Sequence, residues 1–162
     1  MTEISTADEN SRLRSRATPC VGICSTTYGD LVCRGCKRFA HEITGWNGYS
    51  GPQRDEIELR LATLVAGALE RFVIIMDRDT CAAQVGAESS ERPWLERALY
   101  RALRMPARSA ALTAALQDHQ VLRLRSPLAG TDPLAALAQS IESEFLARSK
   151  AAYERSFKVN VD

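Results

Sequence analysis

The chain has 162 residues, of which 45% are hydrophobic and 25% are charged. These values are ordinary for one globular domain, or for one domain with a small appendage. Its apolar runs are far shorter than the ~20 residues that a membrane helix needs, so we expect no membrane-spanning segment and no membrane partner. The net charge of +1 argues against a protein that binds nucleic acid through bulk charge alone. The abundance of alanine and leucine favours a mostly α-helical fold.

Residues 1–17 are polar and carry charges of both signs without an apolar stretch. They therefore lack the pattern of a secretory signal peptide. We expect a disordered lead and a cytoplasmic protein, in a compartment where stable disulfides are rare.

Four of the five cysteines lie close together after this lead, with the spacing C-x3-C-x8-C-x2-C. They are Cys20, Cys24, Cys33 and Cys36. Thiolates bind zinc and iron–sulfur clusters, and two close pairs joined by a short loop can close a tetrahedral site. The turn residues 28–30 can reverse the chain between the pairs. We predict that these four cysteines hold a metal or a cluster; two disulfides, or four free buried thiols, are the alternatives.

The identity of the metal is open at this point. Both pairs fall within the spacing of structural zinc sites, whereas the overall spacing matches neither the bacterial nor the plant ferredoxin pattern. The spacing therefore slightly favours zinc. Three basic residues, Arg34, Lys37 and Arg38, can offset the negative charge of four thiolates, and we expect them to tune the site and its surface.

A longer pattern surrounds the cysteines. It comprises residues 19–24 and 29–36, Arg38, Glu42, Ile43 and Trp46. Over residues 18–60 the sequence resembles a bacterial family of unknown function, domain of unknown function 1289, whose members are often labelled predicted Fe–S proteins. The resemblance implies a zinc- or cluster-binding module carried on a short protein. It implies no reaction, and it leaves zinc and an iron–sulfur cluster equally open.

A short helix is predicted to leave the cysteine module and to end near Gly45. On it Arg38 and Glu42 stand four residues apart, which is the spacing of a surface ion pair. Trp46 and Tyr49 follow, and we expect them to pack the module onto the rest of the chain.

A long helix is predicted next. Ser50 and Gln53 have the spacing of a capping box at its start, and apolar residues recur at steps of three and four over residues 57–75. A short helix over residues 80–85 follows, in which we expect Cys81 to be a small buried apolar residue rather than a reactive thiol.

The rest of the chain predicts three more helices. One is capped by Ser90, one covers residues 109–119, and the last is capped by Thr131. Residues 121–125 alternate between apolar and polar as a short strand does, but the sequence shows no partner strand for them. They can equally be extended chain.

The helix after Ser90 carries four arginines at steps of four, three and four. They are Arg97, Arg101, Arg104 and Arg108. They form one basic stripe only if the helix extends to Arg108, and we expect Pro106 to end it earlier. Such a stripe could bind phosphates or an acidic partner, although a solvated helix face is the commoner meaning.

The sequence thus predicts a mostly α fold in which a small four-cysteine metal-binding module, similar to a zinc knuckle, is docked on an α-helical body. The segments are a disordered lead (1–17), the cysteine module (18–49), an α-helical domain (50–157) and a frayed tail (158–162). The sequence contains no Gly-rich phosphate loop and no G-x-S-x-G motif, so we assign no catalytic residue and do not expect an enzyme by itself.

The expected function is that of a structural or interaction module with a protein partner. Two alternatives stay open. One is an electron-transfer Fe–S protein that serves an oxidoreductase, and the other is a nucleic-acid-binding protein similar to a zinc finger.

Overall fold

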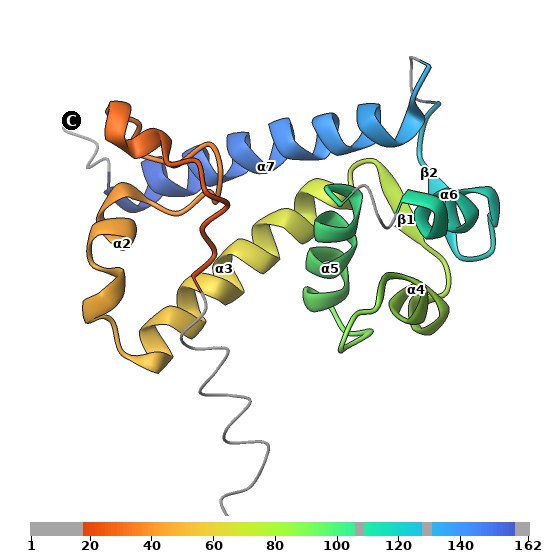
Figure 1. The fold of residues 1–162 in the computed structure, drawn as a ribbon, viewed down its shortest axis with the longest axis horizontal. Coiled ribbons are helices and arrows are strands. Elements are labelled where there is room, and N and C mark those ends of the chain that lie inside the picture. Colours follow the sequence, from red (N-terminus) through yellow and green to blue (C-terminus); the bar gives the residue numbers. More distant parts are fainter. Residues whose placement is uncertain (1–17, 106–108, 128–130, 158–162) are drawn as a thin grey trace, which may run out of the picture.

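The structure is a computed structural model, and it describes residues 18–105, 109–127 and 131–157. Within these residues the fold is mostly helical, as the sequence predicts, with one two-stranded sheet (Figure 1). The predicted disordered lead (1–17) and frayed tail (158–162) lie outside the described residues. None of the described helices is both long and apolar enough to cross a membrane.

The elements follow one another along the chain as short 3-10 turns (η), helices (α) and strands (β). They are η1 (Ser25–Tyr28), α2 (Ala40–Thr44), η2 (Trp46–Gly48), α3 (Gly51–Leu69), β1 (Val73–Ile75), α4 (Arg78–Val85), α5 (Trp94–Leu103), α6 (Ser109–Gln117), β2 (Leu122–Leu124) and α7 (Pro133–Phe157). Figure 1 shows the cysteine module, with α2, at one end of α3 and α7, whereas α4, α6 and the sheet lie at the other end.

Helix α3 begins at the predicted capping box. The Ser50 hydroxyl accepts a hydrogen bond from the Gln53 backbone N–H, and the Gln53 side-chain oxygen accepts one from the Ser50 N–H. The buried face of α3 packs on α5 and α7. Apolar side chains of these three helices form the centre of the core, among them Leu61, Val65, Leu69, Leu95, Leu99, Leu137, Ile141 and Phe145. The apolar stripe predicted for the long helix is therefore part of the core up to the end of α3 at Leu69.

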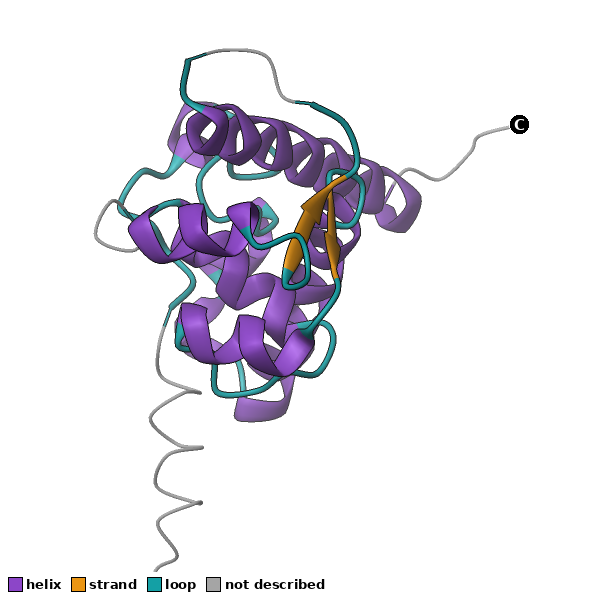
Figure 2. Cartoon of the chain, turned by 90° about the vertical axis from the view of Figure 1, so that its right-hand side faces the viewer, coloured by secondary structure: helices purple, strands orange, loops and turns teal. Residues whose placement is uncertain are grey.

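The long helix ends earlier than its apolar period predicts. Helix α3 stops at Leu69, and Val73–Ile75 form strand β1. This strand pairs antiparallel with β2, so that Val73 lies opposite Leu124 (Figure 2). β-branched side chains favour a strand when a partner strand is available, and here the partner is distant in the sequence. The predicted helix through residue 75 is therefore wrong, while the alternation over residues 121–125 does mark a strand.

Helix α4 confirms the predicted short helix around Cys81 and begins slightly earlier. At its start, Asp77 Oδ1 accepts a hydrogen bond from the Thr80 N–H at 3.0 Å. At its end, Gly86 adopts a left-handed conformation with φ of 64°. Burial raises the pKa of the Cys81 thiol to about 11, so this thiol stays protonated at neutral pH and packs as a small apolar side chain.

Two predicted caps lie a few residues from the observed helix starts. Helix α5 begins after Pro93 rather than after Ser90. Helix α7 is capped by Asp132 rather than by Thr131. Asp132 Oδ1 accepts hydrogen bonds from the backbone N–H groups of Leu134 and Ala135, both at 3.1 Å. A carboxylate at this position also matches the positive end of the helix dipole.

Candidate metal centre

The second cysteine pair lies in a tight hairpin loop. Val32 and Phe39 form an antiparallel bridge, and between them the Cys33 N–H donates to the Arg38 carbonyl oxygen at 2.9 Å. The Lys37 N–H donates to the Cys33 carbonyl oxygen, also at 2.9 Å. Lys37 has a φ of 64°, a left-handed conformation that few residues other than glycine adopt. This conformation lets the loop close within a few residues and hold both cysteines.

The Cys33 sulfur is buried among backbone N–H groups. Burial disfavours its ionised form, but the N–H groups of Cys36, Ser25 and Gly35 outweigh burial and lower the pKa of Cys33 to about 7. The Cys33 thiol also donates to the Ile23 carbonyl oxygen at 3.7 Å. A thiolate is the form of cysteine that binds zinc and iron. The backbone N–H groups here therefore stabilise the metal-binding form of one of the four predicted ligands.

Cys36 lies beside a guanidinium group. Burial raises the pKa of Cys36, while Arg38, whose Nε donates to the Cys36 sulfur at 3.4 Å, opposes that increase. The negative charge of Cys33 adds to the increase. The pair therefore favours one thiolate and one thiol on its own, and a bound cation would favour two thiolates.

The segment that joins the first cysteine pair packs directly on this loop. A Cβ atom on Gly35 would lie 2.6 Å from the Ile23 carbonyl oxygen and 2.7 Å from Val21 Cγ2. Only glycine permits so close an approach. The Arg34 N–H also donates to Ser25 Oγ at 2.8 Å, so the two segments are hydrogen-bonded to each other.

The first pair itself is more open to solvent than the second. Cys20 is exposed, and its sulfur accepts the Gly22 N–H at 3.4 Å. Cys24 is partly buried, and its sulfur lies 2.9 Å from the Thr26 hydroxyl oxygen. The hydrogen bonds of both sulfurs to the described residues join groups only two positions apart in the chain.

The structure thus forms the second pair and lays the segment of the first pair against it. Within residues 18–105, 109–127 and 131–157, no group of three or more His, Cys, Asp or Glu side chains is arranged to hold a metal ion, and the five cysteines are free thiols. The donor set nevertheless fits zinc or iron, because N–H groups and a guanidinium around the second pair stabilise thiolates. Closing a four-sulfur centre requires Cys20 and Cys24 to turn toward the hairpin loop.

Only one of the three basic residues near the cysteines lies at the surface. Arg34 is exposed, and its Nε lies 2.8 Å from Asp30 Oδ2. Lys37 and Arg38 are only 0% and 3% exposed, and Lys37 forms an ion pair with Glu142 of α7. The prediction of a surface position is therefore wrong for Lys37 and Arg38. Lys37 faces α7, whereas Arg38 lies over the Trp46 ring and against the Cys36 sulfur, where it can offset thiolate charge as expected.

The predicted surface ion pair between Arg38 and Glu42 is also wrong. Glu42 is 4% exposed and pairs with Arg60 of α3, whose Nη2 lies 2.7 Å from Glu42 Oε2. The same carboxylate oxygen accepts the Phe39 N–H at 2.8 Å and so caps α2. The Arg60 guanidinium lies 3.8 Å from the centroid of the Phe39 ring. Arg60 therefore holds α2 against α3. The spacing of residues within α2 could not predict this contact, because Arg60 lies on another helix.

The same stretch of chain has relatives. Residues 18–64 match the family described as Protein of unknown function (DUF1289). The match, called the DUF1289 segment below, includes both cysteine pairs, α2 and the part of α3 that carries Arg60. No curated protein and no solved structure matches the chain.

The DUF1289 segment meets α5 and α7 at a polar cluster that no pattern in the sequence predicts. Glu142 of α7 accepts hydrogen bonds from Lys37 Nζ and from the Tyr100 hydroxyl. Arg104 Nη1 donates to the Tyr100 oxygen at 3.1 Å. Burial and the Glu142 carboxylate raise the pKa of Tyr100, so Tyr100 stays protonated and remains a donor. These residues come from three distant parts of the chain, so no local spacing could signal the cluster.

Aromatic rings join the DUF1289 segment to the last turns of α7. The Phe39 ring lies 5.1 Å from the Tyr153 ring and 5.7 Å from the Phe157 ring, between centroids. The His41 ring lies 5.0 Å from the Phe157 ring. Edge-to-face pairs of this kind add to the stabilisation that comes from burial.

The arginines of the predicted stripe do not form one surface. Helix α5 ends before it reaches Arg108, which lies outside the described residues. Arg97 is 8% exposed and forms an ion pair with Glu58 of α3, whereas Arg101 and Arg104 are exposed. Arg97 therefore belongs to the interface between helices and not to a solvated helix face.

Proposed function

We propose that the DUF1289 segment is a metal-binding domain that acts as a structural and interaction element of a cytoplasmic protein. The proposed ligands of a zinc ion or an iron–sulfur cluster are Cys20, Cys24, Cys33 and Cys36. The observation that carries the proposal is the hairpin loop, in which backbone N–H groups lower the pKa of Cys33 to about 7. Such a loop leaves about half of this thiol ionised at neutral pH before any metal binds, far more than an ordinary cysteine.

Charges around the loop support a thiolate-rich centre. Four thiolates around one Zn²⁺ carry a net negative charge, and Arg38 lies against the Cys36 sulfur. Zinc would cross-link the two cysteine-bearing segments, and a cluster would also accept and donate single electrons.

Exposed apolar side chains near the first pair support an interaction role. Val21, Ile23, Tyr28 and Leu31 are all large, apolar and exposed. Large apolar side chains gathered in a short exposed segment are typical of a surface that another protein covers. We therefore propose a protein partner that binds over this segment.

Metal analysis of protein purified without oxygen tests the proposal and separates its two forms. A zinc centre gives about one zinc per chain and no visible colour, while a cluster gives iron, sulfide and a brown colour that bleaches on reduction. Bleaching would favour the role in electron transfer to an oxidoreductase. The double variant Cys20→Ser/Cys24→Ser should lose the metal, and Cys81→Ala is the matched control. Metal-free protein with native order over residues 18–64 would contradict the proposal.

The exposed pair Arg101 and Arg104 favours nucleic-acid binding as a second candidate function. Contacts from arginine to phosphates give an affinity that falls steeply with salt concentration. Salt-sensitive binding to a labelled duplex or single strand would support this candidate. The absence of binding at low ionic strength would eliminate it.

A further inference from the structure

A pocket of about 380 Å³ lies between the cysteine module and the helices α3, α5 and α7. Its buried lining includes the apolar side chains of Leu61, Val65 and Phe145, and also Cys36 and Arg97. Its exposed lining includes Arg101 of α5 and Arg104, which directly follows that helix. A volume of this size lies within the range of roughly 300–1,000 Å³ that small-molecule sites occupy.

The polar wall of the pocket is basic. Arg97 and Arg101 of α5 and Arg104, which follows the helix, all line it. The described lining residues include no Asp or Glu. Burial and the Arg101 charge lower the pKa of Arg97, against the effect of Glu58. The pocket therefore concentrates positive charge beside an apolar floor.

The neighbouring carboxylates leave part of this charge unbalanced. Glu142 is shared, since it pairs with Lys37 and also lies 3.9 Å from Arg104 Nη1. Among the described residues, Arg101 has no carboxylate partner. Unbalanced cations at the rim of an apolar pocket favour the binding of an anion, because the Coulomb attraction is less screened there than in water.

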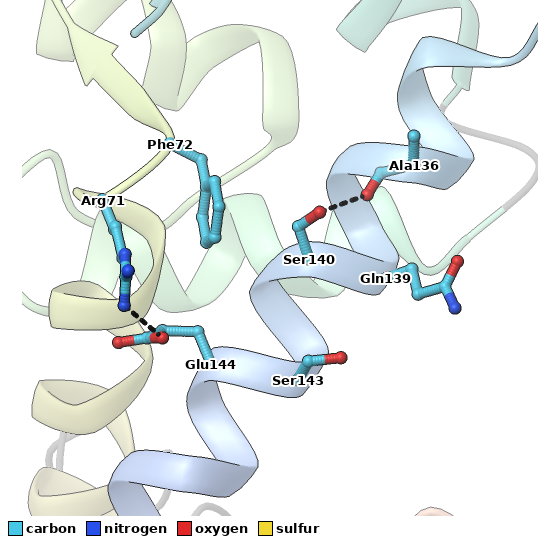
Figure 3. Close-up of a pocket in the computed structure, with 7 residues that line it drawn as sticks. All are labelled: Arg71, Phe72, Ala136, Gln139, Ser140, Ser143 and Glu144. Atoms are coloured by element: carbon cyan, nitrogen blue, oxygen red, sulfur yellow. Dashed lines mark hydrogen bonds and ion pairs between the residues drawn. The ribbon is translucent and has the colours of Figure 1, made fainter. Parts of the chain in front are cut away.

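A second pocket, of about 550 Å³, has the opposite character (Figure 3). In it Arg71 and Glu144 point toward each other, with Arg71 Nη1 2.8 Å from Glu144 Oε2. Arg148 Nε lies 2.9 Å from the other oxygen of the same carboxylate, and the Ser140 hydroxyl donates to the Ala136 carbonyl oxygen at 2.9 Å. Because its charges already pair with one another, this pocket gives no reason to expect an anionic ligand.

We infer that the pocket beside α5 binds an amphipathic anion, that is, a small molecule with a carboxylate or phosphate group and an apolar body. Arg101 and Arg104 hold the anionic group, since guanidinium groups match the geometry of both anions. The apolar body lies on the floor formed by Leu61, Val65 and Phe145, where it leaves water. This ligand is distinct from the metal of the proposed function, and its recognition requires no metal, although the pocket also borders the proposed metal ligand Cys36.

Calorimetric titration of the full chain with three ten-carbon probes tests the inference. We expect decanoate or decyl phosphate to bind at least about tenfold more tightly than decanol, because only the anions engage the arginines. Arg101→Gln should weaken binding of the tighter anion about tenfold and leave decanol unchanged. Arg123→Gln changes an exposed arginine on β2, at the far end of the molecule (Figure 1), and should bind as the wild type does.

The outcomes separate the inference from its rivals. The tighter of the two anions identifies the ligand class as a carboxylate or a phosphate. Decanol binding as tightly as both anions, an unchanged affinity in Arg101→Gln, or no binding of any probe would overturn the inference. Arg101 is exposed, so its substitution should leave the fold intact, which circular dichroism checks. Metal content measured on the same samples reports on the proposed function separately, since that proposal fails on metal content and this one fails on probe affinity.

Discussion

Residues 18–49 bury charged side chains, whereas residues 50–157 bury mainly apolar ones. In the cysteine module Lys37, Arg38 and Glu42 are all buried. In the helical body the core is built from Leu, Ala, Val and Ile side chains, although Glu96 and Arg97 are buried there as well. The module therefore depends on pairing of charges to a degree that the body does not.

Guanidinium groups lie over the buried aromatic rings of the module. Arg38 and Arg54 lie 4.7 Å and 5.5 Å from the Trp46 ring, and Arg60 lies 3.8 Å from the Phe39 ring. A segment this short cannot bury enough apolar surface to order itself. Small domains of this kind gain stability from metals or from docking onto a partner.

The largest effect is expected from Cys33→Ser. The substitution removes the ligand that the hairpin loop prepares, so the module should lose its metal and its order while the helical body stays folded. Metal content and the near-ultraviolet dichroism of Trp46 measure the two losses. Cys81→Ala, which alters a buried thiol of the body, should keep the full metal content. Retention of the metal by Cys33→Ser would contradict the assignment of this ligand.

Glu142→Ala should destabilise the protein by about 2 kcal/mol. It leaves Lys37 buried without its counter-charge and removes the acceptor of the Tyr100 hydroxyl. The cost lies below that of a fully buried pair because the Glu142 side chain is 33% exposed. Urea unfolding measures it. Adding Lys37→Met should recover most of the lost stability, since no buried charge then remains unpaired. A double variant whose loss of unfolding free energy equals the sum of the two single losses would contradict this explanation.

Arg60→Ala should weaken the docking of α2 by about 1–2 kcal/mol, because it removes both the pair with Glu42 and the cation above Phe39. Faster amide exchange over residues 32–44 would report the change. Arg60→Lys should lie between the wild type and Arg60→Ala, since lysine keeps the charge but cannot form two parallel hydrogen bonds. Full protection from amide exchange in Arg60→Lys would show that the positive charge alone, without the guanidinium geometry, holds α2 in place.

The stability of the helical body should fall as pH rises above 9. Burial raises the pKa of Cys81 from 9.0 to about 11, so the unfolded chain loses this proton before the folded chain does. Unfolding is then favoured progressively between pH 9 and 11, by about 1 kcal/mol at pH 10. Urea unfolding at pH 8, 9 and 10 measures the slope. The Cys81→Ala variant should flatten it, and an identical slope in the variant would show that another group is responsible.

The smallest effect is expected from Arg34→Ala. Arg34 pairs with Asp30 on the surface, where water and salt screen the attraction. Thermal unfolding and metal content should both be unchanged within error. A loss of metal would instead place Arg34 among the groups that stabilise the thiolates.

The sequence revealed features that local spacing controls. The cysteine pairs, the capping box of Ser50 and Gln53 and the helix around Cys81 depend on residues a few positions apart. The strand Val73–Ile75 was missed because its partner lies far along the chain. The burial of Lys37 could not be predicted either, since Glu142 becomes its neighbour only when α7 packs against the module.

Amide hydrogen exchange before and after metal removal tests most directly whether a bound metal orders the cysteine module. The protein is purified without oxygen and treated with a strong chelator, and exchange is followed over the whole chain. We expect chelation to remove one metal centre per chain and to accelerate amide exchange over residues 18–49. Amides of α3, α5 and α7 should stay protected from exchange. Slow exchange over residues 18–49 in protein that never held a metal would contradict the role of the metal in ordering the module.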